Sequence, residues 1–174
     1  MRIDILTLFP EMFTGVFGCS IISRAVKGNY LELHTHDIRD YSTDKHRRVD
    51  DYPFGGGAGM VMMVEPIARC IEKLKGERHY DLVLFMAPDG KTFDQNYAYR
   101  LSLCENIMIL CGHYKGVDER VRELFVDEEV IPVLRTFAPT IFFYGFCNVR
   151  EYCFIYVRVY PNELQNKFVP KQKS

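Results

Sequence analysis

The sequence has no long apolar run and no strong excess of either charge. No stretch approaches the roughly 20 apolar residues that a membrane-spanning helix needs, so we expect no contact with a membrane interior. The first residues also lack the basic, apolar and small-residue order of a secretory signal peptide. A formal net charge of −1 over 174 residues creates no overall field for a polyanion, so a nucleic-acid site has to be a local patch.

Closely spaced cysteines are missing too. The six cysteines are scattered along the chain and form no Cys-x-x-Cys pair. This argues against a disulfide framework and a zinc site, and we expect free thiols in a cytoplasmic protein. His34 and His36 are two residues apart on an expected strand, but no further ligand accompanies them, so we predict no metal site.

The charge that is present is unevenly divided. Residues 1–129 carry 16 basic and 21 acidic side chains, whereas residues 130–174 carry 6 and 2 and hold a single glycine, Gly145. We therefore expect a folded domain over residues 1–129 and a divergent tail over residues 130–174.

The first part predicts alternating strands and helices. Residues 82–85 and 107–111 are short, continuous apolar runs, typical of strands buried on both faces. Turns are expected at Pro88-Asp89-Gly90 and at residues 112–116, each followed by a helix, over residues 93–103 and 117–125. Further strands are expected at residues 2–8 and 30–36, and further helices after Pro10, at residues 20–27 and at residues 65–75. This order predicts an α/β fold, a mostly parallel sheet with helices on both faces. Both turns follow the carboxyl ends of strands, where such sheets bind ligands.

Glycines are concentrated in one loop. Residues 55–59 are four glycines and one alanine, between Pro53 and an apolar run at residues 60–64. Glycine adopts positive φ freely and lets another molecule approach the main chain, but ordering it costs entropy. The loop lacks the Lys-Ser/Thr of a Walker motif, and no clear strand leads into it as in a dinucleotide fingerprint. Backbone-mediated binding and a flexible surface turn both remain open.

Three other features have a functional and a plain structural interpretation. Residues 45–48 form the densest basic run, suited to phosphate contacts or else a solvated loop balanced by Asp44, Asp50 and Asp51. Residues 118–120 (DER) open an expected helix, where acids favour the positive end of the helix dipole. A lone histidine such as His113 is more often structural than catalytic.

Five motifs occur in order over residues 1–129. They are residues 6–13 (LTLFPEMF), 39–41 (RDY), 46–51 (HRRVDD), 53–60 (PFGGGAGM), and 111–114 (CGHY) with 116–120 (GVDER). Together they resemble the bacterial tRNA (guanine-N1)-methyltransferase family, which belongs to the SPOUT methyltransferases. The resemblance implies a sheet closed by a deep trefoil knot and a homodimer with sites built from both subunits. It also implies transfer of a methyl group from S-adenosylmethionine to N1 of the tRNA guanosine just 3′ of the anticodon.

The resemblance also implies site residues. In the family, backbone groups of three loops hold the cofactor, and two of these loops look like residues 86–90 and 112–116 here. The implied cofactor-binding residues are Met86, Pro88, Gly90, Gly112, Tyr114 and Gly116. The implied RNA-binding residues are Arg47, Arg48, Asp50, Gly55, Gly56, Gly57 and Gly59.

The sequence departs from the family after residues 127–129 (DEE). The family continues with Ser-Ile-Gly-Asp-Tyr and Gly-Gly-Glu, which form the third cofactor loop and the last pass of the knot, whereas nothing from residue 130 onward matches. The family's catalytic aspartate, its helper arginine and its small helical tRNA-binding domain lie in that part. No catalytic residue is assigned here, and we expect weak or absent methyl transfer by this polypeptide.

Lys115 is a second departure. The family has an acidic residue there, tied to the cofactor's amino group and to magnesium dependence. The reversed charge argues against magnesium assistance in this chain.

The tail and the function each keep alternatives. Residues 140–160 are rich in β-branched and aromatic residues, as strands are, and fit a replacement hairpin. We favour an out-of-frame or unrelated ending, because composition, charge and motif match all break at one place. The alternative functions are a non-catalytic RNA- or cofactor-binding remnant and a truncated or frameshifted fragment without function.

Overall fold

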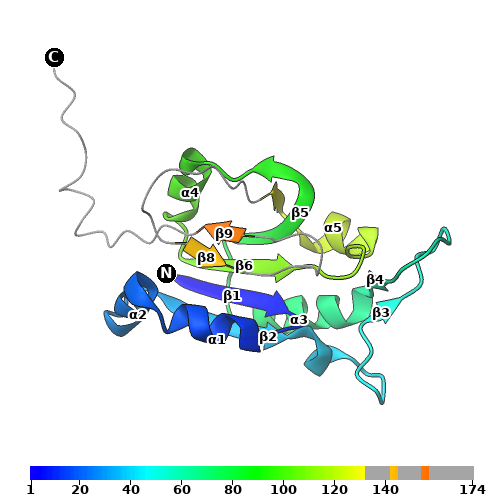
Figure 1. The fold of residues 1–174 in the computed structure, drawn as a ribbon. Helices are drawn as coiled ribbons and strands as arrows, with labels where there is room; N and C mark the ends of the chain where they lie inside the picture. Colours follow the sequence, from blue (N-terminus) through cyan, green and yellow to red (C-terminus); the bar gives the residue numbers. More distant parts are fainter. Residues whose placement is uncertain (132–141, 145–153, 157–174) are drawn as a thin grey trace.

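The computed structural model describes residues 1–131, 142–144 and 154–156. Its centre is a five-stranded sheet in the order β2-β1-β6-β5-β7, in which all neighbouring strands are parallel (Figure 1). The strands are β1 (Arg2–Thr7), β2 (Glu32–Asp37), β5 (Leu82–Thr92), β6 (Asn106–Cys111) and β7 (Glu128–Ile131). The predicted α/β class with a mostly parallel sheet is confirmed.

One face of the sheet is covered by α1 (Glu11–Phe17), α2 (Ser20–Lys27) and α4 (Gln95–Leu101). Phe13 of α1 and Ile22 of α2 pack into a core with Ile3 and Ile5 of β1. Successive side chains of a strand point to opposite faces, so alternate residues of each strand remain for the other side.

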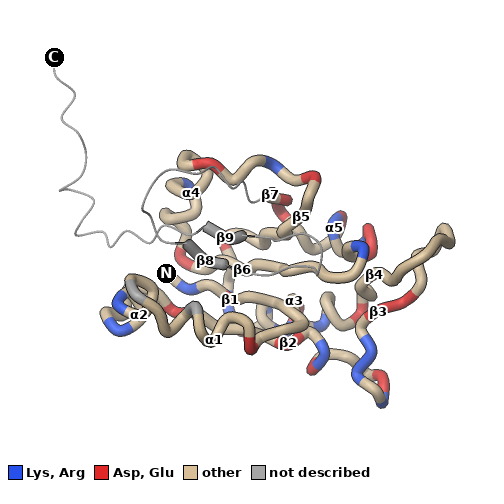
Figure 2. Tube along the Cα trace, in the orientation of Figure 1, with Lys and Arg blue, Asp and Glu red and all other residues tan. Residues whose placement is uncertain are grey.

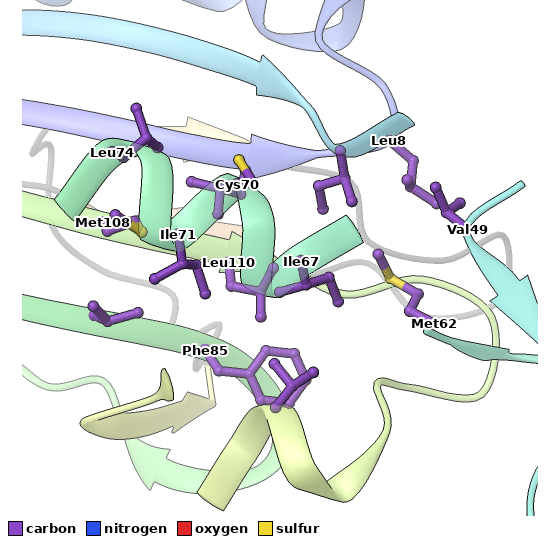
Figure 3. Packing of buried hydrophobic residues seen from close by; sticks show 14 of the residues in the cluster. Leu8, Val49, Met62, Ile67, Cys70, Ile71, Leu74, Phe85, Met108 and Leu110 are labelled. Atoms are coloured by element: carbon purple, nitrogen blue, oxygen red, sulfur yellow. The ribbon is translucent and has the colours of Figure 1, made fainter. Parts of the chain in front are cut away.

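The opposite face is covered by α3 (Val64–Glu77) and α5 (Glu119–Phe125). Figure 3 shows Ile67 and Ile71 of α3 on the side of the helix that faces Leu110 and Phe85 of the strands, while Leu74 lies beside β1. Burial on both faces explains why the central strands have continuous apolar sequences, and it confirms helices on both sides of the sheet.

The predicted end of the strand at Pro88-Asp89-Gly90 is wrong. Strand β5 continues to Thr92, and Met86 and Lys91 both pair with Val130 of β7, so the four residues between them form a bulge. A Cβ atom built on Gly90 would lie 2.5 Å from the backbone nitrogen of Val130, which only glycine avoids. Pro88-Asp89-Gly90 interrupts the pairing but does not end the strand, because β7 pairs again with Lys91 and Thr92.

Smaller elements complete the described residues. A 3₁₀ helix, η1 (Ile38–Tyr41), follows β2, and a two-stranded antiparallel ribbon pairs β3 (Asp50–Asp51) with β4 (Val61–Met62). A second antiparallel pair, β8 (Phe142–Tyr144) and β9 (Phe154–Tyr156), lies within the strand-like 140–160 stretch, whose other residues are outside the described ones. The composition change at residue 129 falls inside β7.

Within the described ranges, no helix is long and apolar enough to cross a membrane. None of the four cysteines there forms a disulfide, while Cys147 and Cys153 lie outside those ranges. No group of three or more His, Cys, Asp or Glu side chains in the described residues is arranged to hold a metal ion.

Asp4 of β1 is a fully buried carboxylate. It accepts hydrogen bonds from Arg2 Nε at 2.7 Å and Arg2 Nη2 at 2.9 Å, and its Oδ1 lies 2.7 Å from Nε2 of His36. Burial alone raises the pKa of a carboxylate, but the hydrogen bonds from His36 and Arg2 outweigh it and hold the pKa of Asp4 well below its usual range. This cluster joins β1 to β2 and gives His36 a carboxylate partner.

Candidate functional site

The bulge inside β5 and the turn that follows β6 lie at the same end of the sheet. Met86 of β5 pairs with Cys111 of β6, so the bulge at residues 87–90 and the turn at residues 112–116 begin side by side. A Cβ atom on Gly112 would lie 3.0 Å from the ring of Phe85, so glycine lets the turn start against the core. The structure therefore places the starts of the two segments predicted to bind a cofactor next to each other.

The predicted turn at residues 112–116 is present and is held by the ribbon strand β4. Tyr114 has a φ of 59° and Gly116 a φ of 127°, both in the left-handed region. Lys115 N donates to Met60 O, and Met62 N donates to Gly116 O, each at 3.0 Å. These main-chain hydrogen bonds fix the conformation of the turn.

The glycine loop ends against this turn. Gly56, Gly57 and Gly59 have φ values of 77°, 105° and 103°. A Cβ atom on Gly59 would lie 2.6 Å from Cε of Lys115, so the lysine stem runs along the loop's glycine backbone. Predicted RNA-binding and cofactor-binding segments are therefore contiguous, although about 55 residues separate them in sequence.

The tip of the same loop is open. Among the described residues, nothing lies within 4 Å of a Cβ atom built on Gly55, Gly56 or Gly57. Phe54 beside them is fully exposed, and Tyr52 is also exposed. An exposed main chain next to aromatic faces is suited to contact with unpaired nucleotides.

The arginines of the basic run already have carboxylate partners. Arg48 Nη2 lies 3.2 Å from Asp44 Oδ1, and Arg47 pairs with Asp40 and, at 3.4 Å, with Asp37. The Arg48 hydrogen bond lowers the pKa of Asp44 to about 2. Figure 2 shows the two charges interleaved along the loop between β2 and β3. A phosphate would have to displace these carboxylates from the arginines. The sequence indicated Asp44 as such a competitor, but it did not indicate Asp37 or Asp40.

A shallow pocket of about 250 Å³ lies between the basic loop and the start of α3. Arg48 and Asp50 line it, together with Glu65 and Arg69, which the sequence analysis did not single out. The sequence did not mark Glu65 and Arg69 as site residues, because charged side chains are ordinary at the exposed positions of an amphipathic helix.

His113 fits a structural role. Its ring packs edge-on against Phe9, with centroids 5.0 Å apart, and against Tyr114 at 4.7 Å. Burial lowers the pKa of His113, so the imidazole is neutral at pH 7.

The acidic residues after α5 are also engaged. Asp127 accepts from Val83 N at 2.7 Å, Glu128 lies 2.7 Å from Nη2 of Arg100, and Glu129 pairs with Arg122. Arg122 also contacts Asp89 in the bulge and was missed by sequence reasoning, because its partners are distant in the chain.

The chain is similar to known proteins in sequence and in fold. The family model described as tRNA (Guanine-1)-methyltransferase TrmD matches residues 1–133. Two proteins named tRNA (guanine-N(1)-)-methyltransferase, from Bacteroides fragilis and Christiangramia forsetii, are 58% and 55% identical to the chain over 130 residues, 75% of this chain. The crystal structure of tRNA (m1G37) methyltransferase from Aquifex aeolicus superposes with a TM-score of 0.70 at 35% identity, covering 79% of this chain and 61% of that one. The chain spans 58% of the length of these two curated relatives.

Proposed function

Because the chain belongs to the tRNA (Guanine-1)-methyltransferase TrmD family, we propose that it serves methyl transfer from S-adenosylmethionine to N1 of the tRNA guanosine 3′ of the anticodon. The single observation that carries this proposal is the position of the 86–90 and 112–116 segments at one edge of the sheet. In parallel sheets that edge is where ligands bind.

The residues of this edge fit the cofactor in kind. Gly90 and Gly112 allow the main chain to pack closely against Val130 and the ring of Phe85, and among the described residues nothing lies within 4 Å of a Cβ atom built on Gly116. Met86, Pro88, Gly90, Gly112, Tyr114 and Gly116 are the residues that would hold the cofactor. When bound, S-adenosylmethionine supplies a methyl group activated by its sulfonium.

The glycine loop and basic loop are proposed to hold the tRNA beside that edge. Contact between Gly59 and Lys115 supports this, since it joins the two regions. Arg47, Arg48 and Asp50, with Gly55, Gly56, Gly57 and Gly59, would contact the RNA. The cations supply affinity for phosphate, and the open glycine backbone gives close approach.

Guanine N1 carries a proton at neutral pH, so a base has to remove it as the methyl group is transferred. The family's aspartate and arginine match no position here, and neutral His113 is packed against Phe9. We therefore propose that residues 1–129 provide binding and orientation, and that this polypeptide transfers methyl groups weakly or not at all.

Three further properties belong to the proposal. They are a cytoplasmic location, a homodimer, and a reaction without magnesium assistance. The exposed cation of Lys115 beside the glycine loop supports the last of these, because like charge opposes a metal ion there.

Calorimetric titration of the purified chain with S-adenosylmethionine tests the proposal, in parallel with transfer of labelled methyl to a tRNA with guanosine 3′ of its anticodon. We expect saturable binding with little transfer. Ready transfer would overturn the statement on activity and leave the family function standing. A chain that melts without cooperativity and does not bind would point to a misassembled fragment and overturn both.

A further inference from the structure

The bulge at residues 87–90 is tied to the rest of the protein by Arg122 of α5. Arg122 Nη2 lies 3.0 Å from Oδ2 of Asp89, the side chain at the middle of the bulge. The bulge residues stand between two pairings to Val130, and proline at position 88 has no N–H to donate. Resting on the proposed function, we propose that Arg122 is a positioning residue that holds this segment, through Asp89, in its cofactor-binding conformation.

Arg122 is itself fixed firmly enough to act in this way. Its Nε donates to Glu129 Oε1 at 2.7 Å, its Nη2 also contacts Glu129, and its Nη1 lies 3.5 Å from Glu119. The guanidinium is a planar fork, so several simultaneous hydrogen bonds set its orientation. Its side chain is three-quarters buried, in contrast to the exposed carboxylate of Asp89.

The same arginine connects the bulge to the partner strand β7. Glu129 is adjacent in β7 to Val130, whose backbone lies against Gly90. Asp89 precedes Gly90 in the bulge. Arg122 therefore holds the bulge and the strand beneath it together, and a change at Arg122 is transmitted to the segment that carries Pro88 and Gly90.

The positive charge of Arg122 offsets the repulsion between nearby carboxylates. One cation faces three carboxylates, those of Asp89, Glu119 and Glu129. The hydrogen bond from Arg122 also lowers the pKa of Asp89. Without the arginine, these carboxylates repel one another, and the one on the least constrained main chain, Asp89, moves away first.

The competing explanation is an ordinary surface ion pair without functional consequence. Exposed pairs contribute about 0–1 kcal/mol to stability, so a change in global unfolding is small under either explanation. The order of residues 87–90 and the affinity for S-adenosylmethionine separate the two explanations.

The test uses Asp89→Asn, Arg122→Gln and their double variant, with Asp89→Glu as the conservative replacement. Arg100→Gln is the matched control, because Arg100 pairs at 2.7 Å with Glu128, a neighbouring carboxylate of the same strand β7. Affinity for S-adenosylmethionine is measured by calorimetry, and the order of the bulge by amide hydrogen exchange at residues 87–92 without ligand.

We expect Asp89→Asn to weaken cofactor affinity about threefold and Arg122→Gln about three- to tenfold, scaled from the strength of exposed ion pairs. The double variant is no weaker than Arg122→Gln, since the arginine acts through Asp89. Amide exchange at the bulge accelerates in all three. Asp89→Glu restores affinity, and Arg100→Gln leaves affinity and exchange at the wild-type values.

Wild-type binding with unchanged affinity and exchange in Asp89→Asn overturns the positioning role and leaves the proposed function intact. Additive losses in the double variant overturn it as well, because they separate Arg122 from Asp89. A wild-type chain that does not bind S-adenosylmethionine refutes the proposed function and the positioning role together. Asp89 is exposed, so Asp89→Asn remains informative even where Arg122→Gln fails to fold.

Discussion

Replacing Gly90 by alanine is expected to damage the sheet edge at the candidate cofactor site. The added Cβ atom would lie 2.5 Å from Val130 N, 2.6 Å from Glu129 C and 2.7 Å from Val130 C. All three atoms are backbone of β7, so no side chain can rotate away. Relief requires a shift approaching 1 Å, in a strand that pairs with β5 on both sides of the bulge.

The cost follows from these contacts. Overpacking a filled interior costs about 1–3 kcal/mol. Each ladder hydrogen bond that is lost as β7 moves adds about 1 kcal/mol. We therefore expect Gly90→Ala to lower the free energy of unfolding by about 2–4 kcal/mol, which corresponds to roughly 4–16 °C in melting temperature for a chain of this size.

Urea unfolding of Gly90→Ala, followed by circular dichroism, is the assay, with Gly76→Ala as control. Gly76 lies in α3 with open space around an added Cβ atom, so alanine there stabilises the helix by about 0.5–1 kcal/mol. Equal stability of Gly90→Ala and wild type would refute the close approach of bulge and strand. So would a gain resembling that of Gly76→Ala.

Three other predictions concern charge. Asp4→Asn lowers the free energy of unfolding at pH 7 by about 2–4 kcal/mol, because Arg2 loses its buried partner. Since folding lowers the pKa of Asp4, this stabilisation is present above about pH 4 and is lost on acidification, so the urea midpoints of wild type and variant converge at low pH. In filter-binding assays, Arg48→Gln weakens tRNA binding and reduces the slope of log K against log salt concentration by about 0.7, the value for one lost phosphate contact, whereas Asp44→Asn releases Arg48 and strengthens binding. Equal slopes for the two variants would contradict a phosphate contact by Arg48. Chelation of Mg²⁺ leaves the calorimetric affinity of the wild-type chain for S-adenosylmethionine unchanged, while Lys115→Glu makes that affinity respond to added Mg²⁺. A response in the wild-type chain would show that the positive charge of Lys115 does not oppose a metal ion.

Local patterns predicted the elements that local sequence determines. The apolar runs at residues 82–85 and 107–111 located two central strands, because a strand buried on both faces needs apolar side chains throughout. The turn at residues 112–116 was also found, since Gly112 and Gly116 are required there for contact with Phe85 and for positive φ.

Features that depend on distant residues were missed. The bulge at residues 87–90 exists because β7, some 40 residues later, pairs on both sides of it, and Pro88-Asp89-Gly90 alone looks like a turn. The β3–β4 ribbon is only two residues long in each strand and leaves no periodic pattern. Arg122 contacts Asp89 across 33 positions, so nothing in its own neighbourhood marked it.

We propose that the bulge within β5 and the turn after β6 form one binding site for the methyl donor. Amide hydrogen exchange with and without S-adenosylmethionine tests it most directly. We predict that the ligand slows exchange in residues 86–91 and 112–116 together, at a single concentration midpoint. Protection of only one of these segments, or protection confined to other parts of the chain, would contradict the account.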